Sequence, residues 1–255
     1  MSDLMTVATE AARQAGAFLH SHFRSSLTVE TKEDRSLVTN VDREAERIIV
    51  ERISASFPEH DVLAEERGRM SRGGDHCWII DPMDGTHNYI RGMPAYGVSI
   101  GVRRGSAFVA GVIFMPETEE LYAAELGSGA FRNGKRIHAS AREQLAGCTM
   151  AFDSELRVDT ARKLRALGEL SQRIFSVRLI GSAARNLSHV AEGALDGVIE
   201  FSDKLWDFAA GVVIVEEAGG RMSRHDGMPL GAGDAAYIAS NGFIHGALQE
   251  IASLA

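Results

Sequence analysis

The second half of the chain changes its hydrophobic period repeatedly, and this alternation limits the folds open to it. Short apolar runs predict strands, whereas longer runs with apolar residues three and four positions apart predict helices. The predicted strands are 148–153, 175–180, 196–201 and 237–240. The predicted helices are 159–173, 183–193 and 206–218, and a short helix closes the chain. Strands and helices in alternation predict an α/β architecture, in which helices cover a sheet.

The first half predicts two helices followed by an antiparallel meander, and therefore has an α+β character. An apolar stripe over 4–23 predicts one helix, and a second begins after Thr39 or Asn40 and ends at Pro58. Thr39 and Asp42 have the spacing of a capping box, with Asp in the usual place of Glu. The tetrapeptide RNGK at 132–135 is typical of a two-residue hairpin. The predicted strands are 77–81, 96–104, 107–115, 120–126 and 129–137.

The domain organisation follows from the absence of a break between the halves. No stretch rich in Pro, Gly or Ser separates them. We therefore expect one domain over 1–255, with two lobes of about 1–146 and 147–255.

Charge and composition argue against several classes of function. Among 255 residues, 27 Lys and Arg stand against 35 Asp and Glu, and the net charge of −8 argues against a general nucleic-acid binder. No apolar run approaches the ~18 residues of a membrane span, and the N-terminal sequence lacks a signal-peptide pattern. The two cysteines, Cys77 and Cys148, predict no disulfide framework. We expect a cytoplasmic protein that does not enter the membrane.

Two short motifs match active-site patterns but lie in the wrong context. GVSIG at 97–101 fits G-x-S-x-G, yet the predicted strand continues past Ser99 instead of turning into a helix. GAFRNGKR at 129–136 has the spacing of a phosphate-binding loop, but Arg136 replaces the required Ser or Thr and a strand follows. We therefore expect neither a serine nucleophile nor a nucleotide-binding loop.

The stretch WIIDPMDGTHNY at 78–89 brings two aspartates out of an apolar strand within one turn. Pro82 has a fixed φ and makes this turn rigid, so that Asp81, Asp84 and the carbonyl of Met83 can converge. Such hard oxygen ligands suit Mg²⁺. The same residues also favour turns and helix caps for purely local reasons, and the motif alone leaves both readings open.

Other carboxylates are predicted to lie near this turn. Glu65 and Glu66 end the preceding strand, and Asp42 and Asp207 each lie in the first turn of a predicted helix. A cluster of four or five carboxylates would be strongly unfavourable without cations. With two or three Mg²⁺ ions, it would form a site for phosphoryl transfer.

Three segments resemble the inositol monophosphatase family, within the lithium-sensitive, magnesium-dependent sugar phosphatases. They are EE at 65–66, WIIDPMDGTHNY at 78–89 and WDFAAGVVIVEEAGG at 206–220, and the match extends from about residue 5 to 250. The resemblance implies a layered αβαβα sandwich of the inositol monophosphatase and fructose-1,6-bisphosphatase type. It also implies a homodimer.

The resemblance further implies a role for each matching residue. Glu65, Asp81 and the Met83 carbonyl would bind one Mg²⁺, while Asp81, Asp84 and Asp207 would bind a second. A third, weaker ion would lie near Glu65. The implied catalytic residues are Thr86, Asp42 and Glu65. The implied substrate-binding residues are Asp84, Gly85, Thr86, Gly181, Ala183, Glu200 and Asp207.

The implied reaction is direct in-line attack of a metal-activated water on a phosphate monoester, without a phosphoenzyme. Myo-inositol monophosphate is the first substrate to consider. Histidinol phosphate and fructose 1,6-bisphosphate are alternatives on the same metal site, and the adenosine-bisphosphate branch is less favoured because its DGTKEF form is absent. A different class of function is a regulatory or scaffold protein, for instance one that contacts RNA-bound machinery, with vestigial catalysis.

Overall fold

The computed structural model describes residues 2–32 and 36–254 of the chain, and two β-sheets dominate it. The larger sheet has eight strands in the order β10-β9-β8-β7-β6-β5-β3-β4. Only β3 and β5 pair in parallel among these neighbours. The strands are β3 (Asp61–Ala64), β4 (Gly68–Met70), β5 (His76–Asp84), β6 (Gly97–Arg104), β7 (Ala107–Met115), β8 (Glu120–Glu125), β9 (Ala130–Arg132) and β10 (Lys135–Arg136).

The smaller sheet has five strands in the order β12-β11-β13-β15-β14 and mixes parallel with antiparallel pairs. A separate two-stranded hairpin precedes the second helix. The five strands are β11 (Thr149–Phe152), β12 (Ser176–Arg178), β13 (Gly197–Glu200), β14 (Arg221–Ser223) and β15 (Tyr237–Ser240), and those of the hairpin are β1 (Val29–Thr31) and β2 (Leu37–Thr39).

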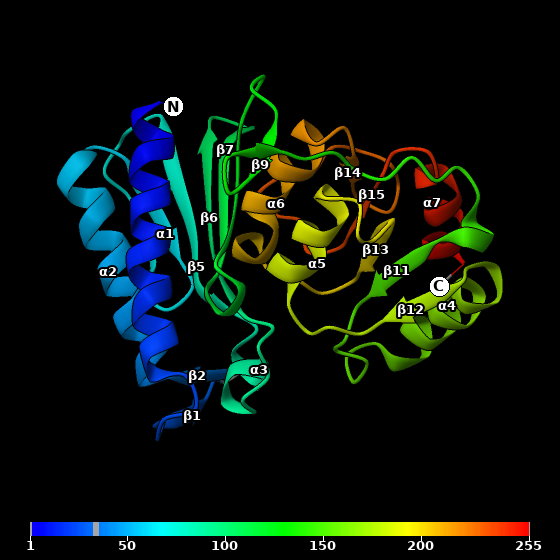
Figure 1. The fold of residues 1–255 in the computed structure, drawn as a ribbon, viewed down its shortest axis with the longest axis horizontal. Coiled ribbons are helices and arrows are strands. Elements are labelled where there is room, and N and C mark those ends of the chain that lie inside the picture. The colour runs from blue at the N-terminus through cyan, green and yellow to red at the C-terminus, as the bar shows by residue number, and fades with distance from the viewer. Residues whose placement is uncertain (1, 33–35, 255) are drawn as a thin grey trace.

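The helices and sheets form five layers, which Figure 1 shows from left to right. Helices α1 and α2 cover the outer face of the large sheet, α5 and α6 fill the space between the sheets, and α4 and α7 cover the far face of the small sheet. The predicted αβαβα sandwich is confirmed. The helices are α1 (Asp3–His22), α2 (Asn40–Ser56), α3 (Thr86–Ile90), α4 (Thr160–Arg173), α5 (Ala183–Ala191), α6 (Leu205–Glu217) and α7 (His245–Ser253).

Alternation along β5 explains why residues 77–80, which lead to the site, are all apolar. Trp78 and Ile80 contribute to the core beneath α1 and α2. Ile79 points to the opposite face and contributes to the core around α5 and α6. Because both faces of this strand are covered, both sets of alternate positions are apolar, as in a strand at the centre of a layered fold.

Several predicted elements match closely, and the deviations have local causes. The capping box of α2 is confirmed, since Thr39 and Asp42 exchange side-chain and backbone hydrogen bonds. The hairpin predicted from RNGK at 132–135 is confirmed: it divides the predicted strand 129–137 into β9 and β10, and Asn133 and Gly134 in its turn adopt φ values of 49° and 76°. The short strands β1, β2, β4 and β14 were not predicted, because three residues are too few to show a period.

Two further expectations concern the whole chain. Over the described residues, none of the helices combines the length and the apolar character needed to cross a membrane. The single domain over 1–255, with a lobe boundary near residue 147, stays a prediction.

Candidate active site

Three carboxylates meet at the point where β5 ends. Asp81 and Asp84 come from β5, and Asp207 comes from the first turn of α6. One oxygen of each lies within 4.8 Å of the other two. Oxygen atoms at this separation can bind the same cation.

A β-bulge makes this convergence possible. In a regular strand, residues three positions apart face opposite sides, so one of the two aspartates would point away from the site. Here Asp81 pairs with Ser99 and Asp84 pairs with Gly97, so three steps along β5 correspond to two along β6. The additional residue of β5 turns both carboxylates to the same side.

The electrostatics of these carboxylates favour a cation. Burial, with the neighbouring charges of Glu65, Asp84 and Asp207, raises the pKa of Asp81 well above its usual value. Burial likewise raises the pKa of Asp84 to about 6. The pKa of Asp207 is raised by burial and then by the charge of Asp203. A bound cation would oppose all three effects, because it favours the charged carboxylate.

Asp84 also connects the two halves of the molecule. Its Oδ1 accepts a hydrogen bond from the Ala183 amide at 3.1 Å, and its Oδ2 accepts one from the Ala184 amide at 3.1 Å. The Ser182 hydroxyl donates to the same Oδ2. Asp84 therefore fixes the start of α5, which lies beside Gly181, at the wall of the site.

Glu65 lies near the three aspartates but is bonded elsewhere. Lys32 donates from Nζ to Glu65 Oε1 at 2.7 Å and to Glu66 Oε1 at 2.5 Å. Lys32 belongs to neither β1 nor β2 and follows β1 directly. Lys32 was not predicted as part of the site, since no local pattern relates it to residues more than thirty positions away. In this arrangement an ammonium group neutralises part of the charge of Glu65 and Glu66.

Thr86 and Asp42 form a hydrogen-bonded pair behind the carboxylates. Thr86 Oγ1 lies 3.0 Å from Asp42 Oδ1 and 2.9 Å from the Met83 carbonyl oxygen. The amide and hydroxyl of Thr39 donate to Asp42 Oδ2 at 2.8 and 2.5 Å. Burial raises the pKa of Asp42 to about 6, although these hydrogen bonds lower it. The capping box of α2 thus holds Asp42 in place to accept the Thr86 proton.

Gly85 occupies a position that a side chain could not fill. Its φ is 84°, in the left-handed region, and an added Cβ would lie 2.7 Å from the Ala95 carbonyl oxygen. Glycine tolerates this conformation at no steric cost. The backbone at Gly85 is therefore able to turn sharply from β5 into α3.

One cavity of about 770 Å³ brings the predicted residues together. Asp42 lies behind Thr86 and does not line the cavity. The cavity also contains charged residues that sequence reasoning missed, among them Asp153 and Asp203. In the sequence, only its position four residues before Asp207 indicated that Asp203 could lie near the site. The predicted residues that line the cavity are Glu65, Asp81, Met83, Asp84, Gly85, Thr86, Gly181, Ala183, Glu200 and Asp207.

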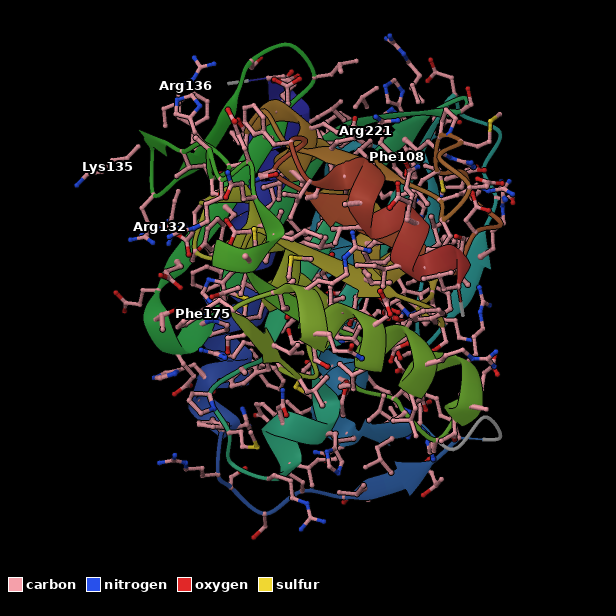
Figure 2. All side chains as sticks on the ribbon, turned by 90° about the vertical axis from the view of Figure 1, so that its right-hand side faces the viewer. Phe108, Arg132, Lys135, Arg136, Phe175 and Arg221 are labelled. Atoms are coloured by element: carbon pink, nitrogen blue, oxygen red, sulfur yellow. The ribbon has the colours of Figure 1, made fainter. Side chains whose placement is uncertain are left out.

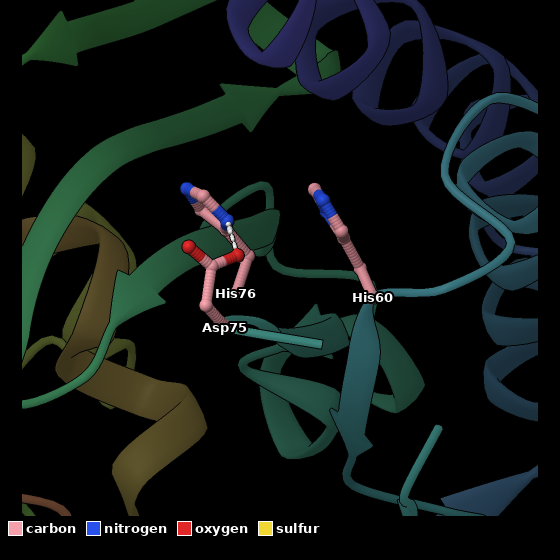
Figure 3. Close-up of side chains that lie close together, drawn as sticks. All are labelled: His60, Asp75 and His76. Carbon is pink, nitrogen blue, oxygen red and sulfur yellow. Dashed lines mark hydrogen bonds and ion pairs between the residues drawn. The ribbon is translucent and has the colours of Figure 1, made fainter. Parts of the chain in front are cut away.

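A second group of potential metal ligands, His60, Asp75 and His76, lies at the opposite end of β5 (Figure 3). The Trp78 indole N–H donates to His60 Nδ1 at 3.1 Å, which places the proton of a neutral His60 on Nε2. Asp75 Oδ1 lies 2.5 Å from His76 Nδ1, and the two imidazole rings stack with centroids 4.7 Å apart. With one nitrogen protonated and the other bonded to Trp78, His60 has no free lone pair for a metal.

Comparison with known proteins decides the family. The family model described as "Inositol monophosphatase family" matches residues 1–254. The chain belongs to the inositol monophosphatase family. The resemblance predicted from three sequence segments is therefore confirmed.

Individual relatives agree with this assignment. The fructose-1,6-bisphosphatase/inositol-1-monophosphatase of Aquifex aeolicus is 38% identical over 252 residues, which cover 97% of this chain and 94% of that protein. The solved IMPase of Thermotoga maritima superposes with a TM-score of 0.91 at 34% identity, covering 99% and 97% of the two chains. A Salmonella typhimurium protein named Nus factor SuhB is 37% identical, covering 89% of this chain and 87% of that one. The present inositol monophosphatase family member is thus a phosphomonoesterase.

Proposed function

We propose that this phosphomonoesterase hydrolyses the phosphate monoesters of polyols, with myo-inositol monophosphate as the first substrate, and that it requires Mg²⁺. The observation that carries this proposal is the group of three aspartates at the bulge of β5, beside a cavity large enough for a polyol. Histidinol phosphate and fructose 1,6-bisphosphate remain alternative substrates for the same site.

The residues present fit Mg²⁺ by their chemistry. Asp81, Asp84 and Asp207 offer carboxylate oxygens, and the Met83 carbonyl and Glu65 lie in the same cavity. These are hard ligands, and their mutual repulsion is relieved by positive charge. We assign these five residues to two or three Mg²⁺ ions. When bound, the ions would acidify a water molecule and neutralise part of the phosphate charge.

The protein itself would orient the reacting groups. We assign to Thr86 the task of holding the attacking water, since its hydroxyl can donate to Asp42 and accept from a water. Asp42 is a positioning residue that keeps this orientation. The amides of Gly85 and Thr86 would donate to the phosphate, which the missing side chain of Gly85 allows to approach closely.

The alcohol part of the substrate would lie against α5 and β13. Gly181 and Ala183 border the cavity at the start of α5, and Glu200 ends β13. Glu200 is 4% exposed, so a substrate hydroxyl would meet it in a largely dry environment. We therefore assign the recognition of a polyol hydroxyl to Glu200.

The test is release of inorganic phosphate from a panel of phosphate esters with and without Mg²⁺. The panel includes myo-inositol 1-phosphate, histidinol phosphate, fructose 1,6-bisphosphate and p-nitrophenyl phosphate. We expect turnover of myo-inositol 1-phosphate that stops with excess chelator and that millimolar lithium inhibits. Turnover in excess chelator would contradict the metal assignment. A homodimer and a cytoplasmic location, both implied by the resemblance, stay predictions.

A second candidate function is non-catalytic, because a relative of similar identity is named a Nus factor. Figure 2 labels six exposed or half-buried basic and aromatic side chains on one side of the molecule. Lys135 and Arg136 extend from a hairpin, well away from Phe175. Arg132 is ion-paired with Glu192 at 2.5 Å. These side chains do not form one continuous basic surface, so we place the catalytic function first.

A further inference from the structure

Glu65, one of the proposed metal ligands, lies at the start of a short loop, residues 65–67, which joins β3 to β4. Ala64, the last residue of β3, pairs in parallel with Ile80, so that Glu65 lies beside Asp81. The Glu65 amide donates to the Ile80 carbonyl at 3.1 Å. After this residue the backbone turns away from β5. The position of the Glu65 carboxylate therefore depends on what holds the rest of the loop.

A buried carboxylate holds the middle of this loop. The Glu66 amide donates to Glu46 Oε2 at 2.7 Å, a contact between residues twenty positions apart. Glu46 belongs to α2 and is fully buried, and it does not line the cavity. Glu46 therefore contacts the backbone next to Glu65 from behind and does not face a substrate in the cavity.

The fold gains little stability from burying Glu46. The neighbouring buried positions of α2, among them Ala45, Ile49 and Ile53, are apolar. Burial raises the pKa of Glu46, so its charge is held at a cost. Among the described residues its second oxygen, Oε1, has no hydrogen-bond partner, and Arg67 Nε lies 3.5 Å away without donating to it. A buried carboxylate with one oxygen unbonded contributes poorly to stability.

Helix α2 supports the site in the same way at a second point. Asp42 lies four residues before Glu46, so the two carboxylates are on the same face of the helix. Asp42 accepts the Thr86 hydroxyl at 3.0 Å, and Glu46 accepts the Glu66 amide. One buried face of α2 thus holds two segments that border the cavity, the start of α3 and the loop 65–67.

We propose that Glu46 is a positioning residue, whose reach from α2 to the Glu66 amide fixes the position of Glu65 in the metal site. This inference rests on the proposed Mg²⁺-dependent function and adds to it a residue outside the cavity. Without the bond from Glu66, the loop is held only at its ends, and Lys32, bonded to Glu65 at 2.7 Å, would draw the carboxylate toward itself. Replacing a residue that orients a metal ligand from behind lowers metal affinity by about tenfold to a hundredfold.

The test separates the reach of this side chain from its charge. Glu46→Gln keeps the length and an oxygen that can accept the Glu66 amide, but removes the charge. Glu46→Asp keeps the charge but is one methylene shorter, so its oxygens no longer meet the amide at bonding distance. By titration calorimetry of the full-length protein, Glu46→Asp should raise the Mg²⁺ dissociation constant by about tenfold or more. Glu46→Gln should leave it nearly unchanged.

A second measurement shows whether Glu46 acts through Glu65. In the variant Glu65→Ala, the three aspartates at the end of β5 still form a group that can bind a cation. The double variant Glu65→Ala/Glu46→Asp should bind Mg²⁺ as Glu65→Ala does, because residues that act through one contact do not have additive effects. A further loss of affinity in the double variant would show that Glu46 acts by another route, and would overturn the proposal.

Glu51 supplies the matched control on the same helix. Its carboxylate is ion-paired with Arg47 at 2.6 Å, and its side chain is 61% exposed. Glu51→Asp should leave the Mg²⁺ dissociation constant as in the unmodified protein. Thermal melting in chelator shows whether each variant is folded. If Glu46→Asp does not fold, Glu46→Met removes the acceptor without placing a charge in the core, and it should cause the same loss of Mg²⁺ affinity.

The outcomes separate this inference from the proposed function. Weaker Mg²⁺ binding in Glu46→Gln but not in Glu46→Asp would show that the charge matters and the reach does not, and would overturn the proposal. Equal affinities in the two variants would overturn it as well. In each of these cases Mg²⁺-dependent hydrolysis of p-nitrophenyl phosphate by the unmodified protein leaves the proposed function standing. If the unmodified protein binds no Mg²⁺, the proposed function fails and this inference fails with it.

Discussion

Asp81 and Asp84 carry the same functional group but have different surroundings. We therefore expect replacement by Asn to shift the melting temperature of the metal-free protein in opposite directions at the two positions. Asp81 accepts one hydrogen bond, from the Met83 amide at 2.9 Å, whereas Asp84 accepts three at the start of α5. In the metal-free protein the charge of Asp81 is mainly a source of repulsion. Asp84 has in addition a structural role, because the backbone N–H groups of Ala183 and Ala184 donate to its two oxygens. The side-chain NH₂ of an asparagine at this position could not accept either bond.

We therefore predict that Asp81→Asn and Asp84→Asn each lower Mg²⁺-dependent turnover by about a hundredfold or more, since each removes a charge from the proposed ion site. With chelator present, Asp81→Asn should raise the melting temperature by about 2–4 °C, as expected for ~1 kcal/mol of relieved repulsion. Asp84→Asn should lower it. Scanning calorimetry of both variants in chelator measures the difference, and shifts of the same sign would contradict the distinction.

Lys163 and Asp153 form a buried ion pair, with Nζ 2.7 Å from Oδ2, and give a second prediction for single residues. Replacing Lys163 by Met leaves the buried carboxylate of Asp153 without its cation, which should lower the free energy of unfolding by about 3–5 kcal/mol. The double variant Lys163→Met/Asp153→Asn should regain much of this loss, since no buried charge is then unpaired. Urea unfolding of both variants tests the pair, and additive losses would show that the ion pair is not the cause.

Helix α6 depends on two glycines of the large sheet for its position. A Cβ on Gly101 would lie 2.8 Å from the Ala209 backbone, and one on Gly111 would lie 2.3 Å from the Ala210 carbonyl oxygen. The helix thus packs directly on the backbone of β6 and β7, and this contact fixes the depth of Asp207 in its first turn. The sequence showed these glycines inside predicted strands but contained no sign of what approaches them.

Helix α7 contains a histidine that makes the fold sensitive to acid. His245 Nδ1 and Nε2 each lie 2.8 Å from a serine hydroxyl, Ser240 on β15 and Ser223 on β14. Burial lowers the pKa of His245 to about 4. Since the unfolded state binds the proton more readily, the contribution of His245 to stability is complete above pH 6.5 and is lost as the pH falls toward 4. The full loss is about 3 kcal/mol.

We expect the free energy of unfolding to depend on pH differently in the unmodified protein and in the variant His245→Gln. Between pH 7 and pH 4.5 the free energy of unfolding of the unmodified protein should fall relative to the variant by about 2–3 kcal/mol. The protein and the variant contain the same carboxylates with raised pKa, whose protonation stabilises the fold over the same pH range. Their contribution to the free energy of unfolding therefore cancels in the difference. Parallel pH profiles from urea titrations would contradict a neutral, buried His245.

At the scale of the whole molecule, hydrophobic period predicted an α/β second half and an α+β first half, whereas the five layers were implied by the resemblance to the family. The apolar stripes of the helices and strands each needed a covering layer, and the αβαβα sandwich satisfies this requirement. The order of strands within the sheets and the pairing of Lys32 with Glu65 were not predictable, because both depend on contacts between distant segments.

A prediction at this scale concerns metal binding and overall stability. Because an ion that binds only the folded state stabilises it by mass action, the melting temperature should rise steadily with Mg²⁺ concentration. The rise should be absent in Asp81→Asn, and chelator should reverse it in the unmodified protein. Differential scanning fluorimetry over a Mg²⁺ series measures this. A melting temperature independent of Mg²⁺ would contradict the proposed site.

The bulge in β5 makes chain length, and not only residue type, a condition of function. Deleting either residue between Asp81 and Asp84 would restore a regular register with β6. Two positions apart, the aspartates would still share a face, but the downstream backbone would be drawn back by one residue. Gly85, Thr86 and the start of α3 would move with it. Substitutions at Pro82 or Met83 that keep the length should therefore be tolerated more readily than any deletion. Sequence changes in this segment should preserve the number of residues between Asp81 and Asp84.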